Sequence, residues 1–106
     1  MPKTLETLLA ELRHRLSGLY GDRLAGLFLY GSQARGDAVT GSDIDVLVVL
    51  KGPVYPAEEI ERTLDVVAGL SFEHDEVVNC VFASERDFAE HDSPLLLNVR
   101  QEGVPI

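Results

Sequence analysis

The sequence predicts one small α/β domain in which helices alternate with short apolar strands. Leucines recur at helical spacing between residues 5 and 19, and strand-favouring apolar runs occupy residues 24–30, 46–50 and 77–82. A helical segment separates the last two runs, and a strand–helix–strand connection of that length makes its strands parallel. A chain of 106 residues is large enough for one modest core, so residues 1–106 are expected to form a single domain.

The first predicted element is an amphipathic helix that begins at Thr4 and ends near Gly18 and Gly21. Its leucines lie three and four residues apart, so they form one apolar face, and charged side chains occupy the other. His14 lies off the leucine face and is expected to be solvated. We interpret this helix as a packing element.

The first apolar run, residues 24–30, ends abruptly at Gly31 and Ser32, which are a turn signal. Gly31 permits backbone geometry closed to other residues and lets a ligand approach the main chain. Ser32 is a favoured N-cap, and its hydroxyl and the following N–H groups can hold an anion. Arg35 ends one expected helical turn and can bind a phosphate bidentately, and Asp37 either holds Arg35 or is an ordinary loop acid.

Asp43 and Asp45 open the second apolar run, after a connector at residues 37–41. Because they are two residues apart on a strand, their carboxylates lie on the same face, separated by roughly 6.6 Å. Such carboxylates repel each other unless a cation lies between them, and Mg²⁺ typically takes one or two carboxylates plus substrate phosphates. A Gly-Ser turn or an Asp-x-Asp pair alone is more typical of turn chemistry. The two together, separated by ten residues and each beside a strand, predict a site for magnesium and a phosphate ligand.

The second half of the chain is predicted to contain a helix at residues 57–70, with Pro56 in its first turn. A loop at residues 73–76 leads into the strand at residues 77–82, where Cys80 is interpreted as a small buried apolar residue. The helix is expected to place Ile60, Leu64, Val67 and Leu70 on the core and Glu58, Glu59, Glu61 and Arg62 outside.

The C-terminal segment is predicted to begin with a short helix capped by Ser84. From Ser93 onward we expect a closing helix, a stop at Gly103 and a terminal edge strand. Such an edge strand would allow a homodimer, although the acidic surface opposes it.

The chain resembles the minimal nucleotidyltransferases (MNT) of the DNA polymerase beta-like superfamily. The resemblance rests on Gly31-Ser32, Arg35-Gly36 and Ser42-Asp43-Ile44-Asp45 before an apolar strand, and it extends to the C-terminal SPLLLNVRQEGVPI. It implies a mixed β-sheet flanked by helices, an α+β arrangement. It also implies a nucleoside triphosphate, with ATP the first choice, on the Gly-Ser turn and Mg²⁺ on the catalytic aspartates. The implied reaction transfers a nucleotidyl group to an acceptor hydroxyl and releases pyrophosphate.

The chain departs from this family at one position. Members competent in transfer usually carry a third carboxylate on the strand where this chain has Asn79. An amide can offer its carbonyl oxygen to Mg²⁺ or bind a ribose of the nucleotide, but it cannot act as a general base. Asp75 or Glu76 is the missing acid if the strand register differs, and otherwise both are exposed loop charges. Two functions therefore stay open: a transferase, and a degenerate module that binds nucleotide or masks a partner.

Charge and length restrict the partners. The net charge of −9 opposes a polyanion, so tight binding to nucleic acid is not expected, whereas a basic protein partner is compatible. The chain is too short for a separate substrate domain, so we expect the acceptor on a partner protein. The resemblance implies a small helical HEPN-type partner in a toxin–antitoxin pair, with this chain as the antitoxin. No apolar run reaches the roughly 18 residues of a membrane span, and no signal peptide is evident, so the cytoplasm is the expected location.

Overall fold

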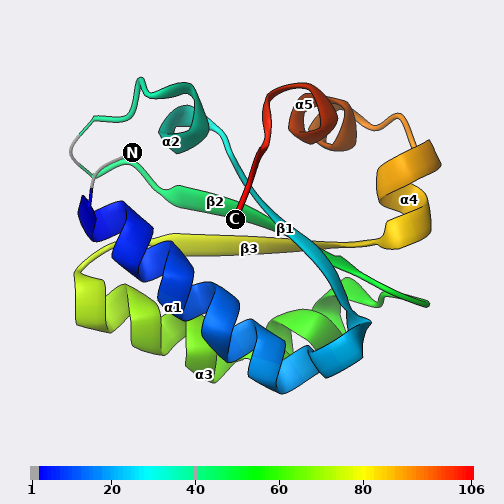
Figure 1. Cartoon of the computed structure of the whole chain (residues 1–106), viewed down its shortest axis with the longest axis horizontal. Coiled ribbons are helices and arrows are strands. Elements are labelled where there is room, and N and C mark those ends of the chain that lie inside the picture. The colour runs from blue at the N-terminus through cyan, green and yellow to red at the C-terminus, as the bar shows by residue number, and fades with distance from the viewer. Residues whose placement is uncertain (1–2, 40) are drawn as a thin grey trace.

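Figure 1 shows the computed structural model, which describes residues 3–39 and 41–106 and consists of a four-stranded sheet between two layers of helices. Of the predicted connector at residues 37–41, residue 40 lies outside the described residues. The elements are α1 (Lys3–Tyr20), η1 (Gly21–Arg23), β1 (Leu24–Tyr30), α2 (Ser32–Arg35), β2 (Ile44–Leu50), α3 (Pro56–His74), β3 (Val78–Ser84), α4 (Glu85–Glu90), α5 (Pro94–Glu102) and β4 (Val104–Pro105).

The sheet is mixed, as expected, with strand order β3-β2-β1-β4. β1 is antiparallel to both β2 and β4, and β2 is parallel to β3 across the α3 connection. In β2, all residues from Val46 to Leu50 are buried. The apolar run that the sequence predicts as a central strand is therefore central.

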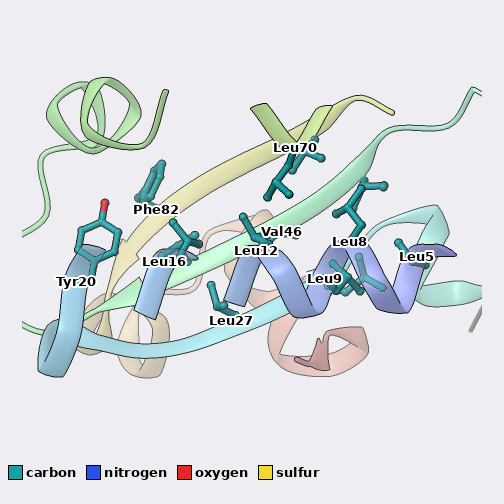
Figure 2. Packing of buried hydrophobic residues seen from close by; sticks show 14 of the residues in the cluster. Leu5, Leu8, Leu9, Leu12, Leu16, Tyr20, Leu27, Val46, Leu70 and Phe82 are labelled. Atoms are coloured by element: carbon teal, nitrogen blue, oxygen red, sulfur yellow. The ribbon is translucent and has the colours of Figure 1, made fainter. Parts of the chain in front are cut away.

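Two cores cover the two faces of the sheet. α1 and α3 lie on one face, and α4 and α5 lie on the other (Figure 1). Alternation along β2 divides its side chains between these faces, so Ile44, Val46 and Val48 enter the larger core and Leu47 and Val49 the smaller. The leucine face of α1 packs on the larger core (Figure 2) through Leu5, Leu8, Leu9, Leu12 and Leu16.

For the first half of α3, the prediction of which side chains are buried is wrong. Ile60 and Leu64 are 54% and 57% exposed, whereas Glu59 is 1% exposed. Glu59 is tolerated inside because its carboxylate accepts hydrogen bonds from the Tyr20 hydroxyl (2.8 Å) and from Arg23 Nη1 (3.2 Å), and a further one from Arg62. With this network in place, Glu59 faces the core, and Ile60 and Leu64 face solvent.

The same network lowers the pKa of Glu59. Burial alone raises the pKa of this carboxyl, but the hydrogen bonds donated by a tyrosine and two arginines outweigh it, and the net shift is downward. On the other side of the contact, burial and the Glu59 carboxylate raise the pKa of Tyr20. The network connects α1, η1 and α3 beneath the sheet.

The end of α3 also differs from the prediction. The helix continues through Glu73 and His74, which the sequence assigns to a loop, and ends at Asp75 in the left-handed conformation (φ 51°). Two contacts with α1 hold this last turn: Arg15 Nη2 lies 3.0 Å from Glu73 Oε2, and His74 Nε2 lies 3.2 Å from Glu11 Oε2. As a result β3 begins one residue later than expected and extends to Ser84.

The C-terminal predictions are confirmed. The Ser84 hydroxyl accepts a hydrogen bond from the Asp87 N–H (3.0 Å) and caps α4, α5 ends at Gly103, and β4 pairs with β1 as an edge strand. Burial raises the pKa of the Cys80 thiol to about 12, consistent with its interpretation as a small apolar residue. Among the described helices, none has the length and apolar character needed to cross a membrane.

We predict that Glu59→Gln lowers the free energy of unfolding at pH 7 by about 2 kcal/mol, because hydrogen bonds to a charged group are lost. The pKa of Glu59 is lower in the folded chain, so its contribution is present above the unfolded value of 4.5 and disappears as the pH falls through the folded value. Urea unfolding of variant and wild type should therefore converge in acid.

The matched control is Glu58→Gln on the exposed face of the same turn, which should change stability by less than about 0.5 kcal/mol. Equal losses in the two variants would show that the buried network contributes nothing specific.

Candidate functional site

Three strands bring the predicted site residues together at one end of the sheet. β1 is antiparallel to β2, so the turn after Tyr30 lies beside the start of β2, and Tyr30 is the register partner of Asp45. β3 is parallel to β2, and its Asn79 is the partner of Asp45 on the other side. Register partners share a face of the sheet, so Tyr30, Asp45 and Asn79 form a row on the face that carries α5.

The backbone of Gly31 lies directly against Asp45 in this row. Its backbone, at φ 74° and ψ −156°, occupies a region that only glycine adopts readily. A Cβ atom at this position would lie 2.7 Å from Asp45 Oδ2, which is closer than real contacts allow. The absence of a side chain at residue 31 therefore lets the turn and the carboxylate lie together.

α2 follows this turn directly. Gly31 is the N-cap and Ser32 the first helical residue, so the expectation that Ser32 itself is the N-cap is wrong. The Gly31 carbonyl accepts hydrogen bonds from the N–H groups of Ala34 and Arg35, both at 3.2 Å. Because the first N–H groups of a helix have no acceptor within that helix, those of Ser32 and Gln33 can donate to an anion. The helix thus begins directly after the turn, as expected, but its cap is shifted by one residue.

Arg35 lies at the exposed C-terminal end of α2. Its Nε atom donates a hydrogen bond to Asp37 Oδ2 at 3.2 Å, and both side chains are about half exposed. Of the two alternatives that the sequence left for Asp37, the structure therefore shows the one in which Asp37 pairs with Arg35. A phosphate that binds Arg35 has to compete with this carboxylate.

Asp43 and Asp45 flank the first residue of β2. Asp43 is exposed and Asp45 is half-buried. Asp43 Oδ2 accepts a hydrogen bond from Asn79 Nδ2 at 2.8 Å. The amide N–H₂ of Asn79 therefore binds one oxygen of Asp43, and the amide carbonyl oxygen is a further acceptor that a cation or a ligand could use.

The donor set of this site fits Mg²⁺. The carboxylate oxygens of Asp43 and Asp45 are hard ligands, and Asp45 lies against the Gly31 turn. Mg²⁺ is commonly bound by one or two carboxylates plus substrate phosphates. In the strand register, Asn79 lies opposite Asp45, whereas Asp75 is the C-cap of α3 and Glu76 lies in the turn that follows it. The alternative in which one of those acids replaces Asn79 is therefore wrong for this register.

The sequence analysis assigned no role in the site to two further residues, Tyr30 and Ser42. Tyr30 is half-buried, and its burial together with the charge of Asp45 raises its pKa. Ser42 exchanges two hydrogen bonds with Val39, both 2.9 Å long, and so closes the loop that leads into Asp43. The pairing of β1 with β2 is the signal that identifies Tyr30, and it cannot be seen until the register is known.

A second group of possible metal ligands lies on the opposite face, between α1 and the end of α3. Among the described residues it is the one group of three such side chains, Glu11, Glu73 and His74. Arg15 Nη2 already pairs with Glu73 Oε2 and lies 3.9 Å from Glu11 Oε2. The Arg15 guanidinium therefore supplies the positive charge that these carboxylates face. This group is accounted for as the contact that holds the end of α3.

One known protein family matches most of the chain. The family model described as the nucleotidyltransferase domain matches residues 6–94. The chain belongs to this nucleotidyltransferase family. The matched segment contains the Gly-Ser turn, both aspartates and Asn79, and the MNT resemblance is confirmed.

Curated relatives of this nucleotidyltransferase include two proteins of Methanocaldococcus jannaschii. "Putative protein adenylyltransferase MJ1305" is 30% identical over 101 residues, which are 92% of this chain and 67% of that protein. MJ0604, with the same description, is 32% identical over 83 residues, which are 78% of this chain and 77% of that protein.

Solved structures have the same fold. A protein described as a "putative minimal nucleotidyltransferase" is 27% identical with a TM-score of 0.60, and the match covers 96% of this chain and 95% of that one. A toxin–antitoxin crystal structure with AMP-PNP is 19% identical with a TM-score of 0.66, and the match covers 94% of this chain and 70% of that one.

We predict that Gly31→Ala destabilises the nucleotidyltransferase more than Gly36→Ala does, because the added Cβ strains the backbone and also strikes the Asp45 carboxylate. Gly36 has φ 78°, and no atom lies within 4 Å of the position that a Cβ would take there, so its cost should be the backbone strain of about 1 kcal/mol alone. Urea unfolding of each variant in wild-type and Asp45→Ala backgrounds measures the difference.

In this double-mutant cycle, Asp45→Ala should recover about 1 kcal/mol of the Gly31→Ala cost and none of the Gly36→Ala cost. Additive effects at Gly31 and Asp45 would show that the two groups are not in contact.

Proposed function

We propose that this chain is a Mg²⁺-dependent nucleotidyltransferase that uses an NTP, with ATP the first choice, and transfers the nucleotidyl group to a hydroxyl on a partner protein. The observation that carries the proposal is the contact between the Gly31 turn and the Asp45 carboxylate, because it joins a phosphate-binding backbone to a pair of metal-binding carboxylates. Membership of the nucleotidyltransferase family supports the reaction class, and the descriptions of the archaeal relatives as protein adenylyltransferases support a protein acceptor and ATP.

In this proposal each site residue has a separate role. The turn at Gly31 and Ser32 holds the β- and γ-phosphates through backbone N–H groups, and Arg35 exchanges Asp37 for a phosphate oxygen. Asp43 and Asp45 hold Mg²⁺, which when bound neutralises phosphate charge and orients the α-phosphate for in-line attack. The acceptor oxygen forms a bond to the α-phosphorus, the bond from that phosphorus to the bridging oxygen breaks, and pyrophosphate leaves.

The acceptor proton has to go to a group other than Asn79. An amide does not accept a proton at neutral pH, so Asn79 binds, through its carbonyl oxygen, either the cation or the nucleotide ribose. Catalysis then depends on positioning and charge neutralisation, and solvent or a group of the partner takes the proton.

The partner that fits this proposal is a small helical HEPN-type protein, with this chain as the antitoxin of the pair. Structures of the same fold include toxin–antitoxin complexes, one of them MntA–HpeT. The net charge of −9 suits a basic partner and opposes direct binding of nucleic acid. No membrane partner is proposed, and the cytoplasm is the compartment in which NTP and such a partner would meet.

We predict that purified chain, incubated with Mg²⁺, each NTP in turn and its co-purifying partner, adds the mass of one nucleotidyl group to the partner. ATP should give the largest gain. Asp45→Ala should abolish it, because one of the two Mg²⁺ carboxylates is lost, whereas Asp65→Ala on the exposed face of α3 should not. Intact-mass spectrometry measures the gain.

Calorimetry measures binding without requiring turnover. ATP should bind to the wild-type chain in the presence of Mg²⁺, and its affinity for the Asp45→Ala variant should be lower. If wild-type chain neither modifies any protein nor binds a nucleotide with Mg²⁺, the proposal fails.

The alternative function is a catalytically degenerate module that binds nucleotide or masks a partner. The observation in its favour is that Asn79 lies opposite Asp45 and donates a hydrogen bond to Asp43, at the position where the family resemblance implies that transfer-competent members usually carry a carboxylate. Under this alternative Mg²⁺ and nucleotide still bind, but no group is transferred.

We predict that Asn79→Asp raises the transfer rate by about 100-fold or more, because the new carboxylate supplies a general base. Without Mg²⁺ the same variant should be less stable than wild type, because a third negative charge replaces the hydrogen-bond donor to Asp43. Single-turnover rates and thermal melting with and without Mg²⁺ measure the two effects. Activity in the variant but none in wild type would establish the degenerate alternative.

A further inference from the structure

Val77 lies directly beside the candidate site. β2 and β3 are paired from Ile44 and Val78 onward. The Ile44 N–H also donates to the Val77 carbonyl (2.8 Å), so the parallel register extends back by one residue and places Val77 opposite Asp43. Val78 enters the larger core, whereas Asn79 donates to Asp43 on the other face of the sheet. Because side chains alternate along a strand, Val77 lies on the same face as Asp43 and Asn79.

The side chain of Val77 is exposed although hydrogen bonds hold the backbone around it. Val77 is 54% exposed. The residues on either side are tied to Ser71: the Glu76 N–H donates to its carbonyl (3.0 Å) and the Val78 N–H to its Oγ atom (3.2 Å). Single exposed apolar residues are common on protein surfaces. This one differs from most because a fixed backbone presents it next to a carboxylate of the site.

The order of the site groups across the sheet determines the side from which an acceptor approaches. The strand order places the Gly31 turn, at the end of β1, and Val77, before β3, on opposite sides of the aspartates of β2. In the proposed function the turn holds the β- and γ-phosphates, which leave as pyrophosphate. In an in-line displacement, the attacking and leaving oxygens lie on opposite sides of the phosphorus. The acceptor hydroxyl therefore approaches from the β3 side, past Val77.

We propose that Val77 determines specificity for the acceptor, by contacting an apolar group of the partner protein next to the hydroxyl that attacks. This inference rests on the proposed transferase function. The acceptor oxygen forms its bond to the α-phosphorus, the bond to the bridging oxygen breaks, pyrophosphate leaves, and the proton goes to solvent or to a group of the partner. Val77 takes no part in these bonds and holds the acceptor segment in place.

Charges beside Val77 favour a protein acceptor over a nucleic acid. Asp75 and Glu76, which precede Val77, are exposed, and so is Asp43 opposite it. A nucleic-acid acceptor would bring further phosphates to these three carboxylates, and like charges repel. An apolar group of a protein side chain meets no such cost and gains the contact with Val77.

The experiment compares Val77→Ala with wild type in two reactions at saturating Mg²⁺ and ATP. The first is transfer to the co-purifying partner, and the second is hydrolysis of ATP to AMP and pyrophosphate without the partner. Val77→Ala should raise KM for the partner by about 10-fold and leave kcat unchanged, because two methyl groups leave a contact that bound partner and transition state share. Hydrolysis and ATP affinity should not change, since water has no apolar group to contact Val77.

Two further variants serve as controls. Val77→Ile keeps a branched apolar side chain and should retain the wild-type KM. Leu19→Ala removes apolar surface from a leucine that is 42% exposed in the last turn of α1, and it should change neither reaction. α1 leads into the start of β1, whereas the site lies at the end of that strand. If transfer requires Asn79→Asp, the same comparisons are made in that background.

The outcomes separate this inference from the transferase proposal. Transfer with an equal KM in Val77→Ala and wild type overturns the inference and leaves the transferase proposal standing. Equal losses in transfer and hydrolysis, or weaker ATP binding, overturn it too, since Val77 would then act on the nucleotide or the fold. A synthetic oligonucleotide that accepts the nucleotidyl group as well as the partner does overturns the choice of a protein acceptor. No transfer by wild type or by Asn79→Asp overturns the transferase proposal, and this inference with it.

Discussion

The antiparallel pairing of β1 with β2 is the constraint on which the site depends. The register that places Tyr30 opposite Asp45 also brings the turn at Gly31 against the carboxylate, and a shift by one residue would turn Asp45 to the other face. A slip by one residue would also exchange the side chains that β2 gives to the two cores, so the packing of both cores opposes it. The packing of the strands thus determines the geometry of the site, and Tyr30 belongs both to the site and to the edge of the smaller core.

The sequence predicts most of the elements because their signals are local. Leucine spacing identifies α1, and Ser84 and Gly103 mark the start and end of their helices by backbone chemistry that does not depend on the rest of the chain. The facing of α3 could not be predicted in this way. Glu59 is buried because Tyr20 and Arg23, about 40 residues earlier, donate to it, and periodicity contains no information about such partners.

In the candidate site, too, some residues can be identified from local sequence signals, whereas their contacts cannot. Short motifs identify Gly31, Asp43 and Asp45, since their chemistry requires particular residues at particular spacing. The environment of each residue needed the structure: Arg35 is held by Asp37, and Asn79 donates to Asp43. That last contact gives the Asp43 carboxylate a hydrogen-bond donor, whereas a carboxylate at residue 79 would place a third negative charge beside it. Asn79 therefore contributes a hydrogen bond to the site without ligands, whereas a carboxylate at residue 79 would contribute a general base for turnover.

The high pKa of the Cys80 thiol has a practical consequence for spectroscopy. A thiol with a pKa of about 12 is ionised to roughly one part in 10⁵ at neutral pH, and the thiolate is the species that reacts with maleimides and iodoacetamides. A cysteine introduced on the surface therefore reacts far faster than the native one. Fluorophores or spin labels can be attached at chosen positions without first replacing Cys80, which leaves the core of the sheet unaltered.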